Sequence, residues 1–294
     1  MLSIANRELS VTGRLIKTAR LKAEYYETVD APADFIKELQ TKSIKADLFS
    51  FLQGAADTTP RFPYHVENDR ISVLPITTYE HWWKSQIGDK VRNMARKAGK
   101  KGVDIKVVPF DNALVNGIAA IYNESPVRQG RRFSHYGKDL ATIYRDHATF
   151  IDRSEFIGAY LHEELIGFIK LVHGADVSNL MQIIAKMVHR DKAPIDALLA
   201  KAVEICAQKG VRRLHYGIWG RGGLREYKVH RGFQCVEVPR YYVGLTLKGT
   251  IALRARLHRN LSEYIPDSWH PTIASWRTKW YSLRYRLKSA PGRS

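Results

Sequence analysis

The stretch from Gly210 to Thr246 constrains the fold of this chain more than any other. Its residue pattern predicts a strand over 213–218, a glycine-rich loop over 220–223, a short helix over 224–230 and a second strand over 234–244. Tyr227 and Lys228 would then lie just beyond the end of the first strand. In an open α/β sheet, ligands bind in the crevice beyond the strand ends. The stretch thus predicts a sheet, the position of a site and a cationic residue within it.

The residues before this stretch extend the sheet. Residues 155–174 predict two strands around a tight turn, and the largely apolar residues 179–189 predict a third, central strand. A helix is expected over 191–210, with Pro194 near its first turn and Gly210 just past its end. This order predicts an α/β (α+β) protein, in which a helix crosses over between two neighbouring strands of a mixed sheet.

We expect three parts along the chain: a small mixed N-terminal region over 1–75, the main domain over 76–250, and a basic, aromatic helical extension over 251–294. A helix is predicted over 78–99. Residues 84–106 contain eight Lys or Arg and two Asp, which gives this segment a net charge of +6. From residue 254 onward, nine Lys or Arg face two acids, a net charge of +7, with Trp and Tyr interleaved. Both segments suit nonspecific contacts with phosphates, and the alternative of a solvated face stays open.

The net charge bounds the partners. The 294 residues carry 47 Lys and Arg against 29 Asp and Glu, a formal charge of +18. Such a field attracts nucleic acid, anionic lipid or phosphate-rich cofactors, although basic proteins without such partners are also common. We therefore keep tRNA and an anionic membrane surface as candidate partners.

Cysteine usage and the apolar segments indicate the compartment. Cys206 and Cys235 lie in apolar patterns without disulfide or metal-ligand spacing, which favours a reducing compartment. No stretch has the roughly 20 apolar residues that a membrane span needs. We expect a cytoplasmic protein, with peripheral contact at the inner membrane face left open. The eleven histidines show no ligand spacing, so we expect no metal.

Several motifs resemble those of a known fold family. HEELIGFIKLVHG is similar to the central hairpin of GNAT acyltransferases, and NLMQIIAKMVHRDKAPIDALLAKAVEICAQKG is similar to their donor-binding strand and helix. VRNMARKAGKKGVDIKVVP resembles the "RNxxRKAxKKGV" segment of the FemABX-like branch, and GGLREYKVHRGF resembles its "GLxxFKxxFG" segment. The resemblance covers roughly residues 76–246.

The resemblance implies a FemABX-like transferase that moves an acyl or aminoacyl group from an activated donor to an amine. The donor would be an aminoacyl-tRNA or an acyl-CoA, and the acceptor a cell-envelope precursor or an amino sugar. CoA-binding GNAT enzymes carry a glycine-containing turn after the donor strand, where this chain has His189–Pro194 without glycine. That departure favours the tRNA ester. An acyl-CoA-dependent N-acetyltransferase and a non-catalytic nucleic-acid- or membrane-binding protein remain the alternatives.

The same resemblance implies site residues. Lys228 matches a family lysine associated with stabilising charge at the donor carbonyl. Tyr227 stands beside it where the family has Phe, and it is a candidate catalytic residue, with a packing role as the alternative. A fixed cation beside a developing oxyanion lowers the barrier to acyl transfer. The fold implies that backbone amides near Met187 and Val188 face the donor carbonyl. Donor phosphates would contact four side chains around them, namely Lys186, His189, Arg190 and Lys192.

A loop over 126–139 is rich in recognition-type side chains. For binding an anionic substrate or the tRNA end we select Arg128, Gln129, Arg132 and Tyr136, together with Trp219 at the end of the 213–218 strand. His135 is a candidate general base because its ordinary pKa lies near neutrality, and Glu124 is a weaker rival for that role. A purely structural role for His135 is the alternative.

Overall fold

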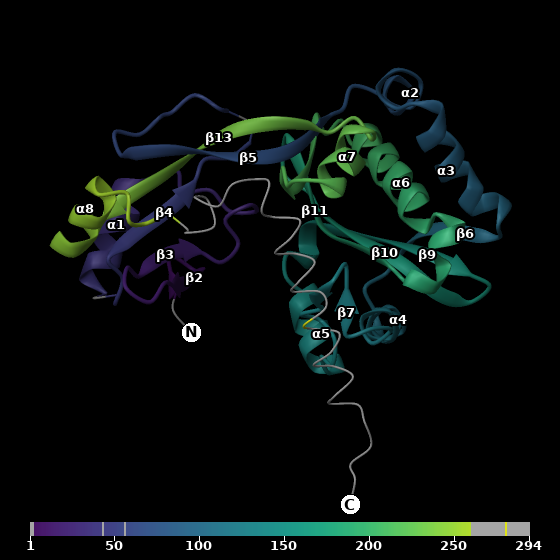
Figure 1. The fold of residues 1–294 in the computed structure, drawn as a ribbon, viewed down its shortest axis with the longest axis horizontal. Helices are drawn as coiled ribbons and strands as arrows, with labels where there is room; N and C mark the ends of the chain where they lie inside the picture. Colours follow the sequence, from purple (N-terminus) through teal and green to yellow (C-terminus); the bar gives the residue numbers. More distant parts are fainter. Residues whose placement is uncertain (1–2, 43, 56, 260–279, 281–294) are drawn as a thin grey trace, which may run out of the picture.

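A computed structural model describes residues 3–42, 44–55, 57–259 and 280. Within them, one sheet of eleven strands runs through the molecule (Figure 1). From one edge to the other its strands are β1 (Ser3–Ile4), β2 (Arg7–Thr12), β3 (Thr18–Leu21), β4 (Leu48–Leu52), β13 (Gln234–Gly244), β5 (His65–Pro75), β12 (Arg213–Ile218), β11 (Val177–Ala185), β10 (Glu164–Val172), β9 (Ser154–Leu161) and β6 (Val103–Val108).

Two long central strands join a smaller and a larger lobe. β13 pairs with β5 antiparallel from Gln234–Val73 to Tyr242–His65, and Figure 1 shows the pair arching from one lobe to the other. The smaller lobe adds β1–β4, α1 (Pro32–Thr41) and α8 (Leu247–Arg254), and the larger lobe holds the other strands. The expected boundary after residue 75 falls at the end of β5, so the sheet is continuous across it. The expected extension beyond residue 259 lies outside the described residues, apart from Trp280.

The larger lobe confirms the predicted mixed sheet. β9 and β10 form an antiparallel hairpin, and α6 (Pro194–Gln208) crosses over from β11 to the parallel strand β12. Pro194 occupies the first turn of α6, and Gly210 adopts a φ of 69° just beyond its end. Proline tolerates the first turn because the missing N–H has no helical partner there, and glycine tolerates positive φ.

Helices cover both faces of this lobe. α3 (Asp89–Lys100) and α6 pack one face around a core that includes Trp82, Ile169 and Leu198. α4 (Asn112–Tyr122) and α5 (Leu140–His147) pack the other face around Phe168. A two-stranded ribbon, β7 (Val127–Arg128) and β8 (Arg131–Arg132), connects α4 to α5. No helix among the described residues is long and apolar enough to cross a membrane.

The helix predicted over 78–99 is divided. It begins as α2 (Tyr79–His81), continues as one π-helical turn (Trp82–Gln86), breaks at Ile87 and Gly88, and resumes as α3. The guanidinium of Arg92 donates to the carbonyls of Trp83 and Ile87, at 2.7 and 2.5 Å. These bonds satisfy carbonyls that the break leaves without helical partners. The helical spacing of the apolar residues, three or four apart, continues across the break, and for this reason the pattern predicts one uninterrupted helix.

A buried lysine joins β10 to the end of α5. Lys170 is fully buried, and its ammonium donates to the carbonyls of His147, at 2.7 Å, and Thr149. Burial lowers the pKa of Lys170 to about 8. These carbonyls end the helix, where a cation is favoured.

We expect Lys170→Met to lower the free energy of unfolding by about 2–4 kcal/mol, because buried carbonyls would lose their donor. Urea denaturation followed by circular dichroism measures this loss. Lys201→Met, which removes a half-exposed lysine of α6, is the matched control and should cost less than about 1 kcal/mol. Equal losses in the two variants would contradict the role given to Lys170.

Candidate active site

The larger lobe has a fork between two parallel strands. β11 and β12 are paired only from Val177–Arg213 to Asn179–His215, yet β11 continues to Ala185 and β12 to Ile218. At the last pair, His215 Nδ1 lies 2.8 Å from Asn179 Oδ1. Burial lowers the pKa of His215 to about 4, so this ring is neutral at physiological pH. The strands separate beyond this pair, which opens the sheet at the carboxyl ends of β11 and β12.

Lys228 lies at the β12 side of the fork. It belongs to α7 (Gly223–Val229), and its Nζ donates to the carbonyls of Tyr216 and Ile218, at 2.7 and 2.6 Å, and to the Ser72 hydroxyl at 3.0 Å. The pairing of β12 with β5 is irregular between His215 and Ile218. Gly217 adopts a φ of 59° there, and such a bulge turns the neighbouring carbonyls out of the ladder.

The charge of Lys228 is held without a carboxylate partner. The side chain is buried, with 2% exposed, its ammonium lies 4.4 Å from the centre of the Tyr216 ring, and its hydrogen bonds go to neutral acceptors. Burial lowers its pKa to about 8. A lysine at this position is therefore still mostly protonated at neutral pH, and it places a fixed positive charge at the end of β12.

Tyr227 supports a neighbouring ion pair. Its ring lies 3.5 Å below the guanidinium of Arg231, and Arg231 pairs with the buried carboxylate of Asp196 in the first turn of α6. Burial raises the pKa of Tyr227. The arrangement gives Tyr227 a packing role, which was one of the two expectations for an aromatic residue here.

The turn after β11 is closed by a carboxylate. Glu124, just after α4, accepts hydrogen bonds from the backbone N–H groups of Met187 (2.7 Å) and Val188 (3.0 Å). The guanidinium of Arg128 donates to the same carboxylate at 2.8 Å, and both side chains are 12% exposed. The two amides predicted to face a donor carbonyl are therefore occupied in this structure. Glu124 is correspondingly ill placed to act as a free base.

The cations expected to hold donor phosphates are partly neutralised. Lys186 and His189 both lie against the carboxylate of Glu164, and Lys192 lies 3.4 Å from Asp191. Residues Met187–Lys192 form a 3₁₀ helix in which the N–H of Ala193 donates to the carbonyl of Arg190. The structure thus gathers Lys186, His189, Arg190 and Lys192 at one turn, as expected, but with acidic partners that the sequence pattern did not reveal.

The loop over 126–139 divides into internal and exposed residues. Arg128 is internal: besides Glu124 it donates to the carbonyls of Ala185 and Ile121, both at 2.8 Å. The His135 ring packs 4.5 Å from the Tyr122 ring, and burial lowers its pKa. Arg132 and Tyr136 are exposed, and Gln129 adopts a φ of 50° in the connection between β7 and β8. Only Gln129 of the selected loop residues lines the cavity described next.

A large cavity lies between the lobes. It measures about 1150 Å³ and combines the loop from Ile218 to Arg225 with parts of β3, β5 and β13. Seven arginines and three acidic residues line it, and the aromatic lining comprises Tyr25, Trp219 and Tyr242. Arg20, Arg131 and Arg225 have no ion-pair partner within the described part of the chain. Ile218, whose carbonyl holds Lys228, belongs to this lining, so the fork and the cavity meet at the end of β12.

Glu67 and His258 of the cavity lining form, with the exposed His65 beside them, a histidine–carboxylate group that the sequence spacing did not predict. Ligand-type atoms of His65, Glu67 and His258 lie within 4.8 Å of one another. The Glu67 carboxylate is already paired with Arg259 at 2.9 Å, which opposes cation binding. His258 is distant in sequence from the other two residues, so no local motif identifies the group.

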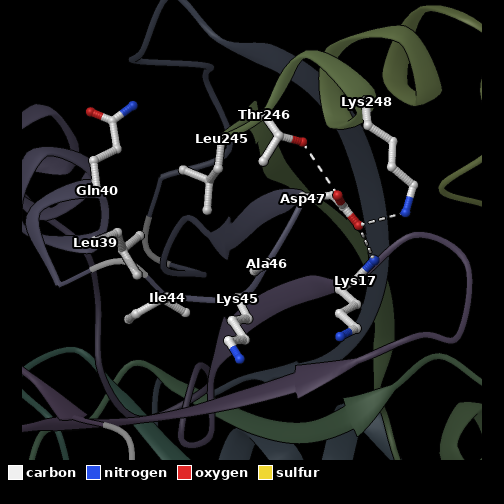
Figure 2. A pocket seen from close by; sticks show the side chains of 10 residues that line it. All are labelled: Lys17, Leu39, Gln40, Ile44, Lys45, Ala46, Asp47, Leu245, Thr246 and Lys248. Carbon is white, nitrogen blue, oxygen red and sulfur yellow. Dashed lines mark hydrogen bonds and ion pairs between the residues drawn. The ribbon is translucent and has the colours of Figure 1, made fainter.

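A second pocket, of about 510 Å³, lies in the smaller lobe (Figure 2). Asp47 organises its rim: its carboxylate accepts from the backbone N–H of Lys17 at 2.8 Å and lies 3.4 Å from the ammonium of Lys248. The hydrogen bond from Lys17 is the main reason that the pKa of Asp47 is lowered. Lysines and aliphatic side chains line most of the rest of this pocket. None of the residues that form the fork lines it.

Comparisons with known proteins agree on the fold. No family model matches the sequence, and no curated protein matches it. Among solved structures, FemX superposes with a TM-score of 0.58 at 11% identity, covering 84% of this chain and 86% of FemX. L-PGS from Bacillus licheniformis gives 0.55 at 13% identity, covering 86% of each chain.

A third structure, from Agrobacterium fabrum, is described as the C-terminal domain (DUF2156) of a putative lysylphosphatidylglycerol synthetase. It gives a TM-score of 0.55 at 11% identity, covering 84% of this chain and 83% of that domain. Each of the three likenesses spans both lobes of this chain, because each covers more residues than the larger lobe contains. The chain therefore has the FemABX-like GNAT fold that its motifs resemble.

Proposed function

We propose that this protein is an aminoacyltransferase. It transfers the aminoacyl group of an aminoacyl-tRNA to an amine of a phosphate-bearing cell-envelope precursor. The acceptor nitrogen forms a bond to the ester carbonyl carbon, and the bond from that carbon to the ribose oxygen of the tRNA breaks. The amine loses one proton and the leaving ribose oxygen takes one up, which gives an amide and a free hydroxyl. The FemX and lysylphosphatidylglycerol synthetase structures, which share the fold, support an aminoacyl donor.

The contacts of the turn after β11 are the observation that favours aminoacyl-tRNA over acyl-CoA as the donor. A CoA pyrophosphate needs free backbone N–H groups and a positive helix N-terminus. Here Glu124 occupies two N–H groups, Pro194 removes another, and the buried Asp196 carboxylate occupies the first turn of α6. Anionic side chains thus lie where the pyrophosphate of CoA would need to bind. This favours aminoacyl-tRNA, a donor that has no pyrophosphate, over acyl-CoA.

Lys228 would supply electrostatic stabilisation. When the amine attacks, the carbonyl oxygen gains negative charge, and a preorganised cation stabilises it more in the transition state than in the ground state. Because the Lys228 protons are directed at Ser72, Tyr216 and Ile218, the lysine acts through its field and does not donate directly. At an effective dielectric constant of about 20, a unit charge about 6 Å away contributes roughly 3 kcal/mol.

The cavity between the lobes is the proposed acceptor site. Its volume exceeds the roughly 300–1,000 Å³ of ordinary small-molecule pockets, which suits a bulky precursor. Arg131 and Arg225 are placed to bind its phosphates, and Trp219 offers an apolar face. The role of His135 as a base stays a prediction, and removing its imidazole would test it.

The test is a transfer assay. A tRNA pool charged with labelled amino acids is incubated with the protein and with amine-bearing envelope precursors, and label in the precursor is measured. Transfer that requires the ester-linked amino acid supports the proposal. Binding of the charged tRNA without either transfer or hydrolysis, over the full set of amino acids, would favour a non-catalytic nucleic-acid-binding protein.

Acetyl-CoA should neither bind nor compete. We expect no thermal shift of the protein at 1 mM acetyl-CoA, because the anion site at the donor turn is filled by Glu124. Isothermal titration with CoA and with inorganic pyrophosphate checks the same point, and a CoA-dependent GNAT acetyltransferase run beside it provides the positive control. Saturable CoA binding in the micromolar range would reject the aminoacyl-tRNA assignment in favour of an acyl-CoA donor.

A further inference from the structure

The α3 helix presents a line of uncompensated cations. Lys90 and Lys97 of α3 and Lys101, the residue that caps its C-terminal end, follow at spacings of seven and four residues, which places them along one side of the helix, within about 40° of a common line. All three are exposed or half-exposed. Within the described residues, none of them has an ion-pair or hydrogen-bond partner on its side chain. We call these three residues the α3 strip.

The segments on either side of α3 lie near the two sides of the fork. In the π-helical turn that precedes α3, the indole N–H of Trp82 donates to the carbonyl of Arg231, beside the helix that carries Lys228. Beyond the end of α3, Val103 of β6 pairs with Leu161, which closes the β9–β10 hairpin together with Glu164. The Glu164 carboxylate in turn pairs with Lys186 of the donor turn. Figure 1 shows α3 along the outer margin of the larger lobe, between α2 and β6.

We propose that the α3 strip binds the phosphate backbone of the donor tRNA while its aminoacylated end lies at the fork. This inference rests on the proposed function and adds the surface that holds the body of the donor. Unpaired lysines in a row match a polyanion, since each phosphate contact releases condensed counterions. The helix is about 18 Å long, enough to follow several phosphates of one strand.

The composition of α3 favours RNA over a membrane as the partner. A helix that lies in a membrane interface inserts large apolar side chains beside its basic residues. Over Asp89–Lys100, no large hydrophobic side chain is exposed, and Val91 and Ala98 are buried against the lobe. The strip therefore offers charge without an insertion surface.

The test measures binding of deacylated tRNA to Lys90→Glu/Lys97→Glu/Lys101→Glu. The matched control is Lys17→Glu/Lys37→Glu/Lys45→Glu, which makes the same change in net charge on exposed lysines of the smaller lobe, two of them visible in Figure 2. Filter binding at several salt concentrations gives Kd and its salt dependence. We expect the strip variant to lose at least tenfold in affinity and its log–log salt slope to fall by about 2–3, and the control to change by less than threefold.

Three results would overturn the strip. The first is an equal loss of tRNA affinity in the strip and control variants, and the second is unchanged tRNA affinity in the strip variant. The third is a strip variant that loses affinity for anionic phosphatidylglycerol vesicles, measured with the same proteins, but not for tRNA. A short aminoacylated RNA that carries only the end of the acceptor arm separates this proposal from the proposed function. The strip variant should transfer from that RNA at the wild-type rate. If the wild type transfers the amino acid neither from the full aminoacyl-tRNA nor from the short RNA, the proposed function is rejected, whatever the strip binds.

Discussion

Replacing Lys228 by Met is expected to reduce aminoacyl transfer by about 100-fold, with little change in donor affinity. The methionine keeps most of the volume and removes the charge at the end of β12. The same change leaves the Tyr216 and Ile218 carbonyls without a donor, so we also expect a loss of about 2–4 kcal/mol in the free energy of unfolding. Rates must therefore be normalised to the folded fraction at a temperature well below unfolding.

Two further variants separate charge from packing. Ser72→Ala removes one acceptor and leaves the ammonium in place, so its transfer rate should stay within about threefold of the wild type. Lys22→Met removes an exposed lysine of the smaller lobe and should change neither quantity. A fall of less than fivefold in Lys228→Met, once corrected for folding, would remove the lysine from the mechanism.

The pH dependence of the transfer rate and of the free energy of unfolding gives a second, independent test of the role of the Lys228 charge. Burial lowers its pKa to about 8, so the charged, active form is lost as the pH rises through 8, and the transfer rate should decline above that point. Stability moves in the opposite direction. Between about pH 8 and 10.5 the unfolded chain binds a proton that the folded chain has released, so this lysine makes the free energy of unfolding rise with pH over that window.

Both trends should be absent from Lys228→Met, apart from the stability increase that Lys170 contributes in the same pH window. Initial rates and urea denaturation at matched pH values measure them. A wild-type rate that stays flat to pH 10, while the protein remains folded, would show that the charge of Lys228 is not used.

Local patterns are sufficient to predict most of the larger lobe. The hairpin, the crossover helix and the segment after Gly210 each carry their own periodicity and turn residues, and each forms where it was expected. The central strand also forms, but it ends at Ala185 and not at His189 as predicted, because Met187–Lys192 turns into a 3₁₀ helix. The position of Lys228 beyond β12 follows from the same reading. Its burial does not, because a helix lysine is ordinarily solvated and the bulge at Gly217 is a property of the pairing with β5.

The contacts that the sequence did not predict are long-range ones. Glu124 reaches amides 63 and 64 residues away, and Asp196 meets Arg231 across α6 and α7. The first half of β5, His65–Asp69, is mostly polar and has no strand signal of its own, and it is extended because β13 pairs along it. Only the assembled sheet supplies such partners, and they determine both the closed donor turn and the cavity between the lobes.

Arg240 joins the segment after β3 in the smaller lobe to the central strands β5 and β13, and its loss should cause the largest change in stability. It lies on β13 with 3% of its side chain exposed. Its guanidinium donates to both oxygens of Glu24, at 2.8 and 2.9 Å, and to Asp69 of β5 at 2.8 Å. Burial alone would lower the pKa of Arg240, but the hydrogen bonds and charges of Glu24 and Asp69 raise it. The cluster is therefore a charge network taken out of water, with one cation between two carboxylates.

Arg240→Met should lower the free energy of unfolding by about 3–5 kcal/mol, because two carboxylates would remain buried or half-buried without their cation. Urea denaturation at pH 7 measures the loss. Arg61→Met, which breaks an exposed pair with Asp57, is the matched control and should cost less than about 1 kcal/mol. Adding Glu24→Gln and Asp69→Asn to Arg240→Met should recover much of the loss, since neutral amides need no counter-charge. A loss below about 1 kcal/mol for Arg240→Met would mean that the carboxylates are solvated through the cavity and do not depend on the cation.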